Sequence, residues 1–341
     1  MHPAKEIAGS SGSELKGRRV CLCVCGSVAC YRAVDAAREL MRRGAEVFPV
    51  LSESAAQMVS PELFQAATGN EAITRLSGEL EHIQLVGRKG ICDAVLVAPA
   101  TANTISKLAH GISDSVVSTV LATALASKPI VLAPAAHDAL MENPVVKENE
   151  ERLRALGVVF VPPIEEEGKA KIADAEEIAD HVARALTKQS LAGRRVVVTA
   201  GATREHFDDV RFISNPSSGR MGVALAREAW LRGASVRLVA GHVDVGVPRY
   251  VERVNVTSVE EMRAAVLAEA ADYFLIPGAP GDFVPRKKEK GKISSAGGLT
   301  LELAPAPKIR ADIKRKFPKA KLVLFKAESG VSDDELEKKA S

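Results

Sequence analysis

The chain has 341 residues, 46% of them hydrophobic and 26% charged, with a formal net charge of +3. This length allows about two domains, each large enough to bury its own core. The nearly balanced charge argues against a dominant polyanion partner such as nucleic acid, and no apolar run is long enough to span a membrane. We therefore expect a globular protein of the cytoplasm.

Residues 1–16 open the chain without the apolar stretch of a secretory signal. We expect them to form a disordered lead-in. Residues 17–52 then predict a strand, a glycine-containing loop, a helix and a second strand.

Three of the five cysteines, Cys21, Cys23 and Cys25, alternate along the first predicted strand. Alternation puts their side chains on one face of that strand. The spacing fits neither a C-x-x-C metal site nor a disulfide framework. We expect these cysteines to be small apolar residues of a buried strand.

Two further apolar runs, "DAVLVAPA" (93–100) and "KPIVLAPA" (128–135), are typical of buried parallel strands. A predicted helical stretch over 104–126 separates them. The order of a strand, a helix and a strand indicates an α/β sheet that helices cover on both faces.

Residues 193–241 repeat the opening pattern of 17–52 with a longer loop, which marks a second α/β domain. The runs "DYFLIPGA" (272–279) and "KLVLFKAE" (321–328) predict its further buried strands. The boundary between the halves should lie near residues 187–195. We expect two Rossmann-like domains, each with three α/β/α layers.

Two loops of the second half, "TAGATRE" (199–205) and "SNPSSGR" (214–220), are rich in small and hydroxyl-bearing residues. Where such loops follow parallel strands, their backbone N–H groups can bind phosphate oxygens at a helix N-terminus. Neither loop matches G-x-x-x-x-G-K-[ST] or G-x-G-x-x-G. The residues thus leave open a nucleotide triphosphate site or an ordinary capped turn.

Many ordered motifs carry a resemblance to a known family. "GSVACYRA", "EHIQL", "APATANTISKLAHGISDSVVST" and "PAAHDALMENP" resemble motifs of a flavin-binding decarboxylase. "TAGATREHFDDVRFISNPSSGRMG", "GAPGDF", "KGKIS" and "FKAES" resemble those of a ligase. In this order the chain resembles the archaeal type of the bifunctional phosphopantothenoylcysteine decarboxylase/phosphopantothenate–cysteine ligases of coenzyme A biosynthesis.

The resemblance implies a flavodoxin-like decarboxylase domain over 17–188 that uses FMN. FMN would take electrons from the substrate thiol, which makes loss of CO₂ easy, and would then return them. The family's flavin site lies between subunits, which implies a trimeric core. The positions that match its cofactor site are Gly26, Ser27, Ser52, Thr101, Ala102, Asn103, Ser118 and Thr119.

His82 matches the family's active-site histidine, with an implied role in orienting the substrate carboxylate or moving the thiol proton. His137 stands where bacterial members have an asparagine that binds that carboxylate. Bacterial members also have a cysteine that donates the last proton, but this chain reads "GKAKIAD" there. Lys171 or water would have to act instead.

The ligase domain over 189–341 is implied to join 4′-phosphopantothenate to cysteine with CTP and Mg²⁺. Its matching catalytic positions are Arg211, Asn215 and Lys292. On the nucleotide and substrate side the matching positions are Ala279, Asp282, Pro307, Lys308, Ile309, Arg310, Phe325 and Lys339. Family members continue past the equivalent of Ser341, so we expect a C-terminally incomplete ligase domain.

Three rival readings remain at this point. A decarboxylase alone, or a protein like the flavin prenyltransferases, would leave the second half inactive. A pyridine-nucleotide oxidoreductase would fit the twin openings, but the G-x-G-x-x-G fingerprint is missing. A scaffold flavoprotein would bind partners without catalysis.

Overall fold

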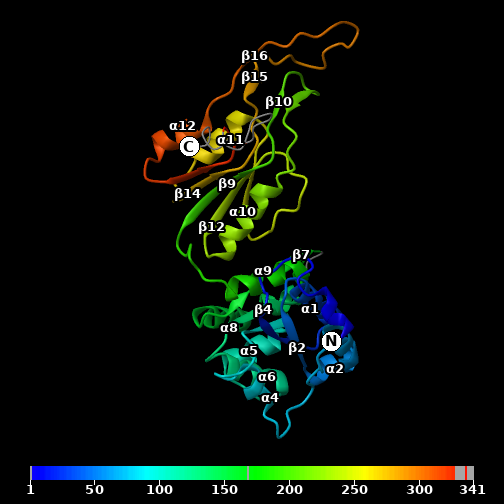
Figure 1. Cartoon of the computed structure of the whole chain (residues 1–341). Coiled ribbons are helices and arrows are strands. Elements are labelled where there is room, and N and C mark those ends of the chain that lie inside the picture. The colour runs from blue at the N-terminus through cyan, green and yellow to red at the C-terminus, as the bar shows by residue number, and fades with distance from the viewer. Residues whose placement is uncertain (1, 167–168, 327–334, 336–341) are drawn as a thin grey trace. The chain divides into compact units, whose positions relative to one another are not determined.

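The computed structural model describes residues 2–166, 169–326 and 335, and the chain divides into two compact units, residues 1–188 and 189–341. Both units have helices on the two faces of a parallel sheet (Figure 1). The predicted α/β class is thus confirmed. Over the described part of the chain, no helix combines the length and the apolar character needed to cross a bilayer.

The first unit is built on five parallel strands in the order β2-β1-β3-β4-β6, which is the flavodoxin-like order. These strands are β1 (Arg19–Val24), β2 (Glu46–Leu51), β3 (Ala94–Ala100), β4 (Ile130–Pro134) and β6 (Val159–Phe160). A small antiparallel sheet joins β5 (Ala136–His137), β8 (Lys169–Lys171) and β7 (Ile164–Glu166).

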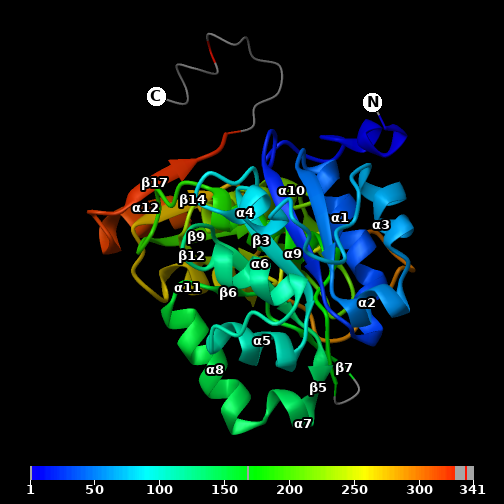
Figure 2. The same cartoon turned by 90° about the horizontal axis from the view of Figure 1, so that it is seen from below.

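Helices cover both faces of the five-stranded sheet, and Figure 2 shows them from below. One face carries α1 (Ala33–Arg42), α3 (Pro61–Thr68) and α9 (Ala175–Leu186). The other carries α4 (Glu81–Val86), α5 (Ala102–Ala109), α6 (Val116–Ala124) and α8 (Pro144–Ala155). The unit is completed by the 3-10 helices η1 (Pro3–Ile7) and η2 (Val28–Arg32) and by α2 (Glu53–Met58) and α7 (Asp138–Met141).

The alternating cysteines face one side of β1, as the sequence predicts. Cys21, Cys23 and Cys25 belong with Cys92 to the apolar cluster under α4, α5 and α6. All five cysteines of the chain are buried free thiols. Their expected place in a buried strand is confirmed.

Residues 2–16 differ from the disordered lead-in that the sequence suggests. The Lys5 ammonium donates to Glu46 at 2.7 Å and to Asn70 at 3.0 Å, and Leu15 is fully buried. The segment therefore packs on the first unit. Individual hydrogen bonds and one buried side chain hold residues 2–16 in place. The sequence has no hydrophobic periodicity there that would predict an ordered segment.

The helical stretch expected over 104–126 is two helices, α5 and α6, with a break between them. Gly111 has a φ of 67°, in the left-handed region that glycine adopts most easily. Ser115 then starts α6, because its hydroxyl and that of Ser118 each accept from the other's backbone N–H. The break brings both serines to the carboxyl end of the sheet.

The second unit has five parallel strands in the order β13-β12-β9-β14-β17. Numbered along the chain, this order is 3-2-1-4-5, as in Rossmann folds. The strands are β9 (Arg195–Ala200), β12 (Ser235–Ala240), β13 (Glu252–Asn255), β14 (Tyr273–Ile276) and β17 (Lys321–Leu324). Helix α10 (Arg220–Leu231) covers one face, while α11 (Val259–Leu267) and α12 (Ile309–Lys316) cover the other.

Two antiparallel pairs extend from this sheet. One is the hairpin of β10 (Arg204–His206) and β11 (Phe212–Ser214), and the other joins β15 (Phe283–Pro285) and β16 (Leu303–Pro305). Both follow the carboxyl ends of central strands, because β10 comes after β9 and β15 comes after β14.

Each sheet reverses its strand order at one place. In the first unit this place lies between β1 and β3, and in the second it lies between β9 and β14. Ligands of doubly wound sheets bind beyond the carboxyl ends of the strands at such a point. The fold thus predicts one site in each unit.

Candidate functional site

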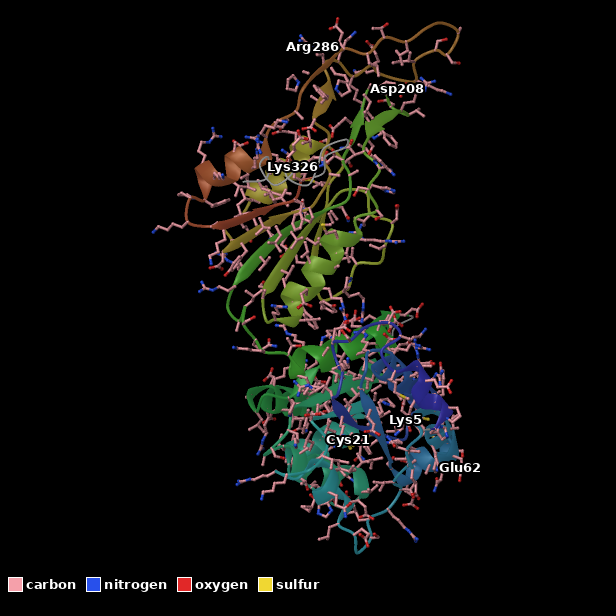
Figure 3. The ribbon with its side chains drawn as sticks, in the orientation of Figure 1. Lys5, Cys21, Glu62, Asp208, Arg286 and Lys326 are labelled. Atoms are coloured by element: carbon pink, nitrogen blue, oxygen red, sulfur yellow. The ribbon has the colours of Figure 1, made fainter. Side chains whose placement is uncertain are left out.

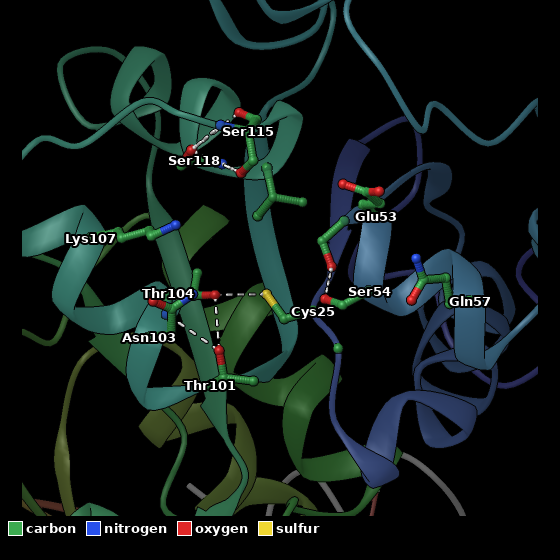
Figure 4. Close-up of a pocket in the computed structure, with 13 residues that line it drawn as sticks. Cys25, Glu53, Ser54, Gln57, Thr101, Asn103, Thr104, Lys107, Ser115 and Ser118 are labelled. Carbon is green, nitrogen blue, oxygen red and sulfur yellow. Dashed lines mark hydrogen bonds between the residues drawn. The ribbon is translucent and has the colours of Figure 1, made fainter.

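A cavity of about 400 Å³ opens at the carboxyl ends of β1, β2 and β3 (Figure 4). One wall comes from α2, with Glu53 and Gln57, and the opposite wall comes from α5, with Lys107. Its lining residues are Cys25, Gly26, Ser52, Glu53, Ser54, Gln57, Thr101, Asn103, Thr104, Lys107, Ser115, Val117 and Ser118.

The cavity passes close to the backbone at Gly26, directly after β1. A Cβ atom placed on Gly26 would lie 2.3 Å from the Ser54 hydroxyl oxygen and 3.1 Å from the Ser54 carbonyl carbon. Any side chain here would thus collide with the first turn of α2. That turn is held by Ser52, which caps α2 by accepting from the Ala55 N–H and whose hydroxyl lies 3.2 Å from that of Ser54.

The β3 side of the cavity is a network of hydroxyl groups. The Thr101 hydroxyl caps α5 and lies 3.0 Å from that of Thr104, which donates to the Cys25 sulfur at 3.1 Å. Burial raises the pKa of the Cys25 thiol to about 11, although the Thr104 hydrogen bond opposes the rise. Cys25 is therefore a neutral thiol at physiological pH.

Two charged side chains line the cavity: Lys107 is the cation and Glu53 is the anion, while the other lining residues are uncharged. The Lys107 ammonium bonds Asp114 at 2.7 Å, and Asp114 also accepts from the Ser118 hydroxyl at 3.2 Å. In Figure 4 the ammonium points into the space between Thr104 and Ser118. A polar cavity with one cation suits an anionic ligand.

Five of the eight residues expected to bind a cofactor line this cavity: Gly26, Ser52, Thr101, Asn103 and Ser118.

The other three lie elsewhere. The Ser27 hydroxyl caps η2 by accepting from the Ala29 N–H, Ala102 is buried at the start of α5, and Thr119 is half-buried on α6. Each is one residue away from a lining position, and motif matching alone does not say which neighbour faces the cavity.

Sequence reasoning missed Ser54, Gln57, Thr104, Lys107 and Ser115, which also line the cavity. For three of them helical spacing gave a signal. Thr104 and Lys107 follow Thr101 at steps of three, and Ser115 precedes Ser118 by three, so each set shares one side of a helix.

The residues expected to act on the substrate are placed outside this cavity. His82 lies on α4, which packs on α6, and its Nδ1 atom is buried and has no hydrogen-bond partner among the described residues. His137 is exposed on β5. Lys171, the expected substitute proton donor, pairs with Glu166 at 2.8 Å in the small sheet.

In the second unit, the loops after β9 and β14 meet at the predicted point. The backbone N–H of Ala279 donates to the Gly201 carbonyl at 2.8 Å. The Asn215 amide, beyond β11, donates to the carbonyls of Ala279 at 3.4 Å and Pro280 at 3.2 Å. Residues 201–215 thus contact the 279–280 loop directly.

Small residues make this convergence possible. Gly219 caps α10 with a φ of 73°, and a Cβ atom on Gly222 would lie 2.4 Å from the Thr199 carbonyl oxygen. Buried hydroxyls fix the β14 loop, because Thr199 accepts from the Gly278 N–H at 2.9 Å and Thr203 from the Gly281 N–H at 3.0 Å.

Two of the expected catalytic cations are brought near each other. The Arg211 guanidinium donates to the Asp208 carboxylate at 3.0 Å and to the Ile293 carbonyl at 2.9 Å. Lys292 directly precedes Ile293 and is exposed. The hairpin tip that carries Arg211 is therefore hydrogen-bonded to the segment 291–293 that carries Lys292.

Four of the expected nucleotide-side residues, 307–310, lie at the start of α12 (Ile309–Lys316). The exposed Lys308 ammonium pairs with Asp282 at 2.8 Å, and Lys308 is the N-cap residue of α12. Ile309 is buried, Pro307 is half-buried, and Arg310 and Phe325 are exposed. Lys339 lies outside the described residues. Within the described ranges, no three His, Cys, Asp or Glu side chains gather as a metal site.

Two family models match the chain and divide it between them. The flavoprotein model matches residues 8–187, and the model described as the DNA/pantothenate metabolism flavoprotein C-terminal domain matches residues 191–341.

Similar proteins include two that bear the name coenzyme A biosynthesis bifunctional protein CoaBC. The one from Thermococcus kodakarensis is 46% identical over 342 residues, which cover 98% of this chain and 84% of the relative. The one from Bacillus subtilis is 37% identical over 330 residues, 92% of this chain and 81% of the relative.

Solved structures similar to parts of the chain include the FMN-dependent cysteine decarboxylase SpaF, with 29% identity and a TM-score of 0.45. That match covers 51% of this chain and 99% of SpaF. The C-terminal domain of a coenzyme A biosynthesis bifunctional protein CoaBC has 32% identity and a TM-score of 0.39 over 45% of this chain and 74% of that chain.

Proposed function

The chain belongs to the family of the coenzyme A biosynthesis bifunctional proteins, and we propose that each of its two units carries one of the family's two reactions. The protein is an enzyme with phosphopantothenoylcysteine decarboxylase and phosphopantothenate–cysteine ligase activities. The decarboxylase would occupy residues 17–188 and the ligase residues 189–341.

The cavity at β1 and β3 is the proposed FMN site. Its residues fit this group, because Gly26 leaves room beside the backbone, six hydroxyl side chains and two amides converge there, and Lys107 supplies positive charge. Bound FMN would supply the redox chemistry that makes loss of CO₂ easy. The protein's part is to hold the phosphate with small and hydroxyl residues and to exclude water from the buried wall at Cys25.

His82 and His137 are proposed to handle the substrate. A neutral imidazole can accept a proton near pH 7 and return it as imidazolium, so His82 suits the thiol proton. The N–H of a neutral imidazole can also donate one hydrogen bond, which suits His137 to the substrate carboxylate. His82 does not line the cavity of its own chain. We therefore assign it to the cavity of a neighbouring subunit in a trimer.

The second unit is proposed to ligate cysteine. The carboxylate of 4′-phosphopantothenate would attack the α-phosphate of CTP, and pyrophosphate would leave. The cysteine amine would then form the amide bond while CMP leaves and the ammonium proton is lost. Negative charge grows on the phosphoryl and acyl oxygens, so fixed donors and cations stabilise both steps.

The described side chains give each role a candidate. Arg211 and Lys292 would neutralise the phosphates, and the Asn215 amide would donate to the acyl oxygen. Lys308, freed from Asp282, and Phe325 would contact the nucleotide. Mg²⁺ would arrive bound to the CTP phosphates.

One observation carries the ligase assignment. The loops after β9 and β14 are hydrogen-bonded to each other, and Asn215 donates to the β14 loop, at the point where a Rossmann sheet binds its ligand. Arg211, in the same hairpin as Asn215, donates to the carbonyl of Ile293, the residue after Lys292. We propose that the enzyme works in the cytoplasm, because the substrates of both reactions are charged, water-soluble metabolites.

Two variants test whether each unit carries one reaction, and each variant is the control for the other. His82→Asn should keep bound flavin and CTP-dependent pyrophosphate release but lose CO₂ release from phosphopantothenoylcysteine. Asn215→Asp should keep CO₂ release but lower pyrophosphate release about 100-fold, because a carboxylate cannot donate to the acyl oxygen. If either variant impaired both reactions equally, the assignment of one reaction to each unit would be wrong.

A further inference from the structure

Asp208 is a buried carboxylate in the tip of the β10–β11 hairpin, where Figure 3 labels it. Its side chain has no exposed surface, whereas that of neighbouring Arg211 is 33% exposed. A buried charge is costly unless several donors satisfy it. The burial of a charged side chain at this position therefore points to a specific role for Asp208.

Each of the two carboxylate oxygens of Asp208 accepts two hydrogen bonds. Oδ1 accepts from the backbone N–H groups of Val210 at 2.8 Å and Arg211 at 2.6 Å. Oδ2 accepts from the Arg211 guanidinium at 3.0 Å and from the backbone N–H of Ile293 at 3.2 Å. The Oδ1 bonds are local to the hairpin, but the Oδ2 bonds reach a functional side chain and a distant loop.

Hydrogen bonds join Asp208, Arg211 and Ile293 in a closed ring. The same Arg211 nitrogen that donates to Asp208 also donates to the Ile293 carbonyl at 2.9 Å. On the other side of Lys292, the Gly291 N–H donates to Asp209 at 2.6 Å. The backbone on both sides of Lys292 is thereby tied to the hairpin tip that carries Arg211.

We propose that Asp208 is a positioning residue of the ligation site, which orients the Arg211 guanidinium and fixes the segment of Lys292 against it. This inference rests on the proposed ligase function. A free arginine side chain loses much conformational entropy when it binds an anion. A carboxylate that holds one edge of the guanidinium removes that cost before the substrate arrives and leaves the other N–H groups for phosphate.

The ionisation of Asp208 agrees with this role. Desolvation raises its pKa, but the backbone donors of Val210, Arg211 and Ile293 and the charge of Arg211 outweigh that effect and lower the pKa to about 2. The carboxylate is thus charged throughout the pH range in which the enzyme works.

The test uses the full-length protein with Asp208→Asn, and Asp209→Asn as the matched control. Asp209 is the adjacent carboxylate and also binds the 291 loop, but its side chain is 54% exposed and the structure gives it no bond to Arg211. For Asp208→Asn we expect CTP- and cysteine-dependent pyrophosphate release to fall about 100-fold in kcat. The control should stay within about threefold, and CO₂ release should be unchanged in both.

A double-mutant cycle separates positioning from mere loop stability. If Asp208 acts through Arg211, Asp208→Asn should slow the Arg211→Ala protein less than about threefold, because the group it positions is already gone. A multiplicative loss in the double variant would overturn the proposal. So would an Asp208→Asn rate equal to that of Asp209→Asn.

A second measurement decides the matter if Asp208→Asn does not fold. Guanidinium ion at millimolar concentration should restore part of the pyrophosphate release of Arg211→Ala, because the intact Asp208 holds it, whereas neutral urea should not. No recovery would then overturn the proposal. If the wild-type protein released no pyrophosphate, the proposed ligase function itself would fail. A normal Asp208→Asn beside an inactive Arg211→Ala would refute only the positioning role.

Discussion

Gly26 lies where a single added methyl group would meet the first turn of α2 across the proposed flavin cavity. In Gly26→Ala the new Cβ would come within 3.1 Å of the Ser54 backbone, so that turn would have to move. Overpacking of this kind costs about 1–3 kcal/mol, so we expect FMN affinity to fall about tenfold or more. Flavin fluorescence titration measures it.

Gly78→Ala is the control for that change. Gly78 has open space around it and no left-handed φ, so its variant should bind FMN like the wild type. Equal FMN affinity of Gly26→Ala and the wild type would show that the cavity at β1 does not hold the flavin.

Lys107 lines the cavity, although the motif matches did not include it among the expected cofactor-binding residues. In Lys107→Met the length of the side chain is kept while its charge is lost, so the cavity would have no cation and Asp114 would lose its partner. We expect FMN to bind about tenfold more weakly, and its affinity to depend less on salt because one screened attraction is gone. Titrations at low and high ionic strength test both effects.

The exposed Lys89 on the same unit provides the matched substitution, Lys89→Met. It should change neither the affinity nor its salt dependence. If both lysine variants behaved alike, general surface charge and not the cavity cation would govern flavin binding.

At the scale of elements, α10 packs closely against β9 at Gly222. Gly222→Ala would place a methyl group 2.4 Å from the Thr199 carbonyl oxygen, a rigid backbone atom. We expect the ligase unit to lose about 1–3 kcal/mol of unfolding free energy. Urea unfolding followed by pyrophosphate assays should show this loss.

Gly246→Ala is the comparison for this element, since nothing lies within 4 Å of its added Cβ. It should stay within about 0.5 kcal/mol of the wild type. A Gly222→Ala protein as stable as Gly246→Ala would mean that α10 can move away from β9 at little cost.

At the scale of the whole molecule, the proposed trimer makes a cavity depend on two chains. Mixed assemblies of His82→Asn with Gly26→Ala should regain CO₂ release, because an intact cavity from one chain can meet His82 from the other. At an FMN concentration that saturates the wild-type cavity but not the Gly26→Ala cavity, each protein alone should release little CO₂. Assemblies of His82→Asn with the double variant Gly26→Ala/His82→Asn should stay inactive, and regain of activity there would contradict the role of His82.

Much of the architecture followed from local sequence. Apolar runs and the repeated opening pattern predicted both parallel sheets, because strand burial and helix periodicity are encoded over a few residues. The resemblance to known motifs added the two activities.

The sequence by itself therefore determined the fold class and the order of the main strands and helices, and it predicted the loops to which we assign the chemistry. Only the tertiary structure decided which neighbour within a motif faces the cavity: Thr104 and Lys107 face it, whereas Ser27 and Thr119 do not. It alone joined Asp208 to Ile293, 85 residues apart. The physical reason is that side-chain direction and long-range hydrogen bonds depend on how packed elements meet, which no local pattern specifies.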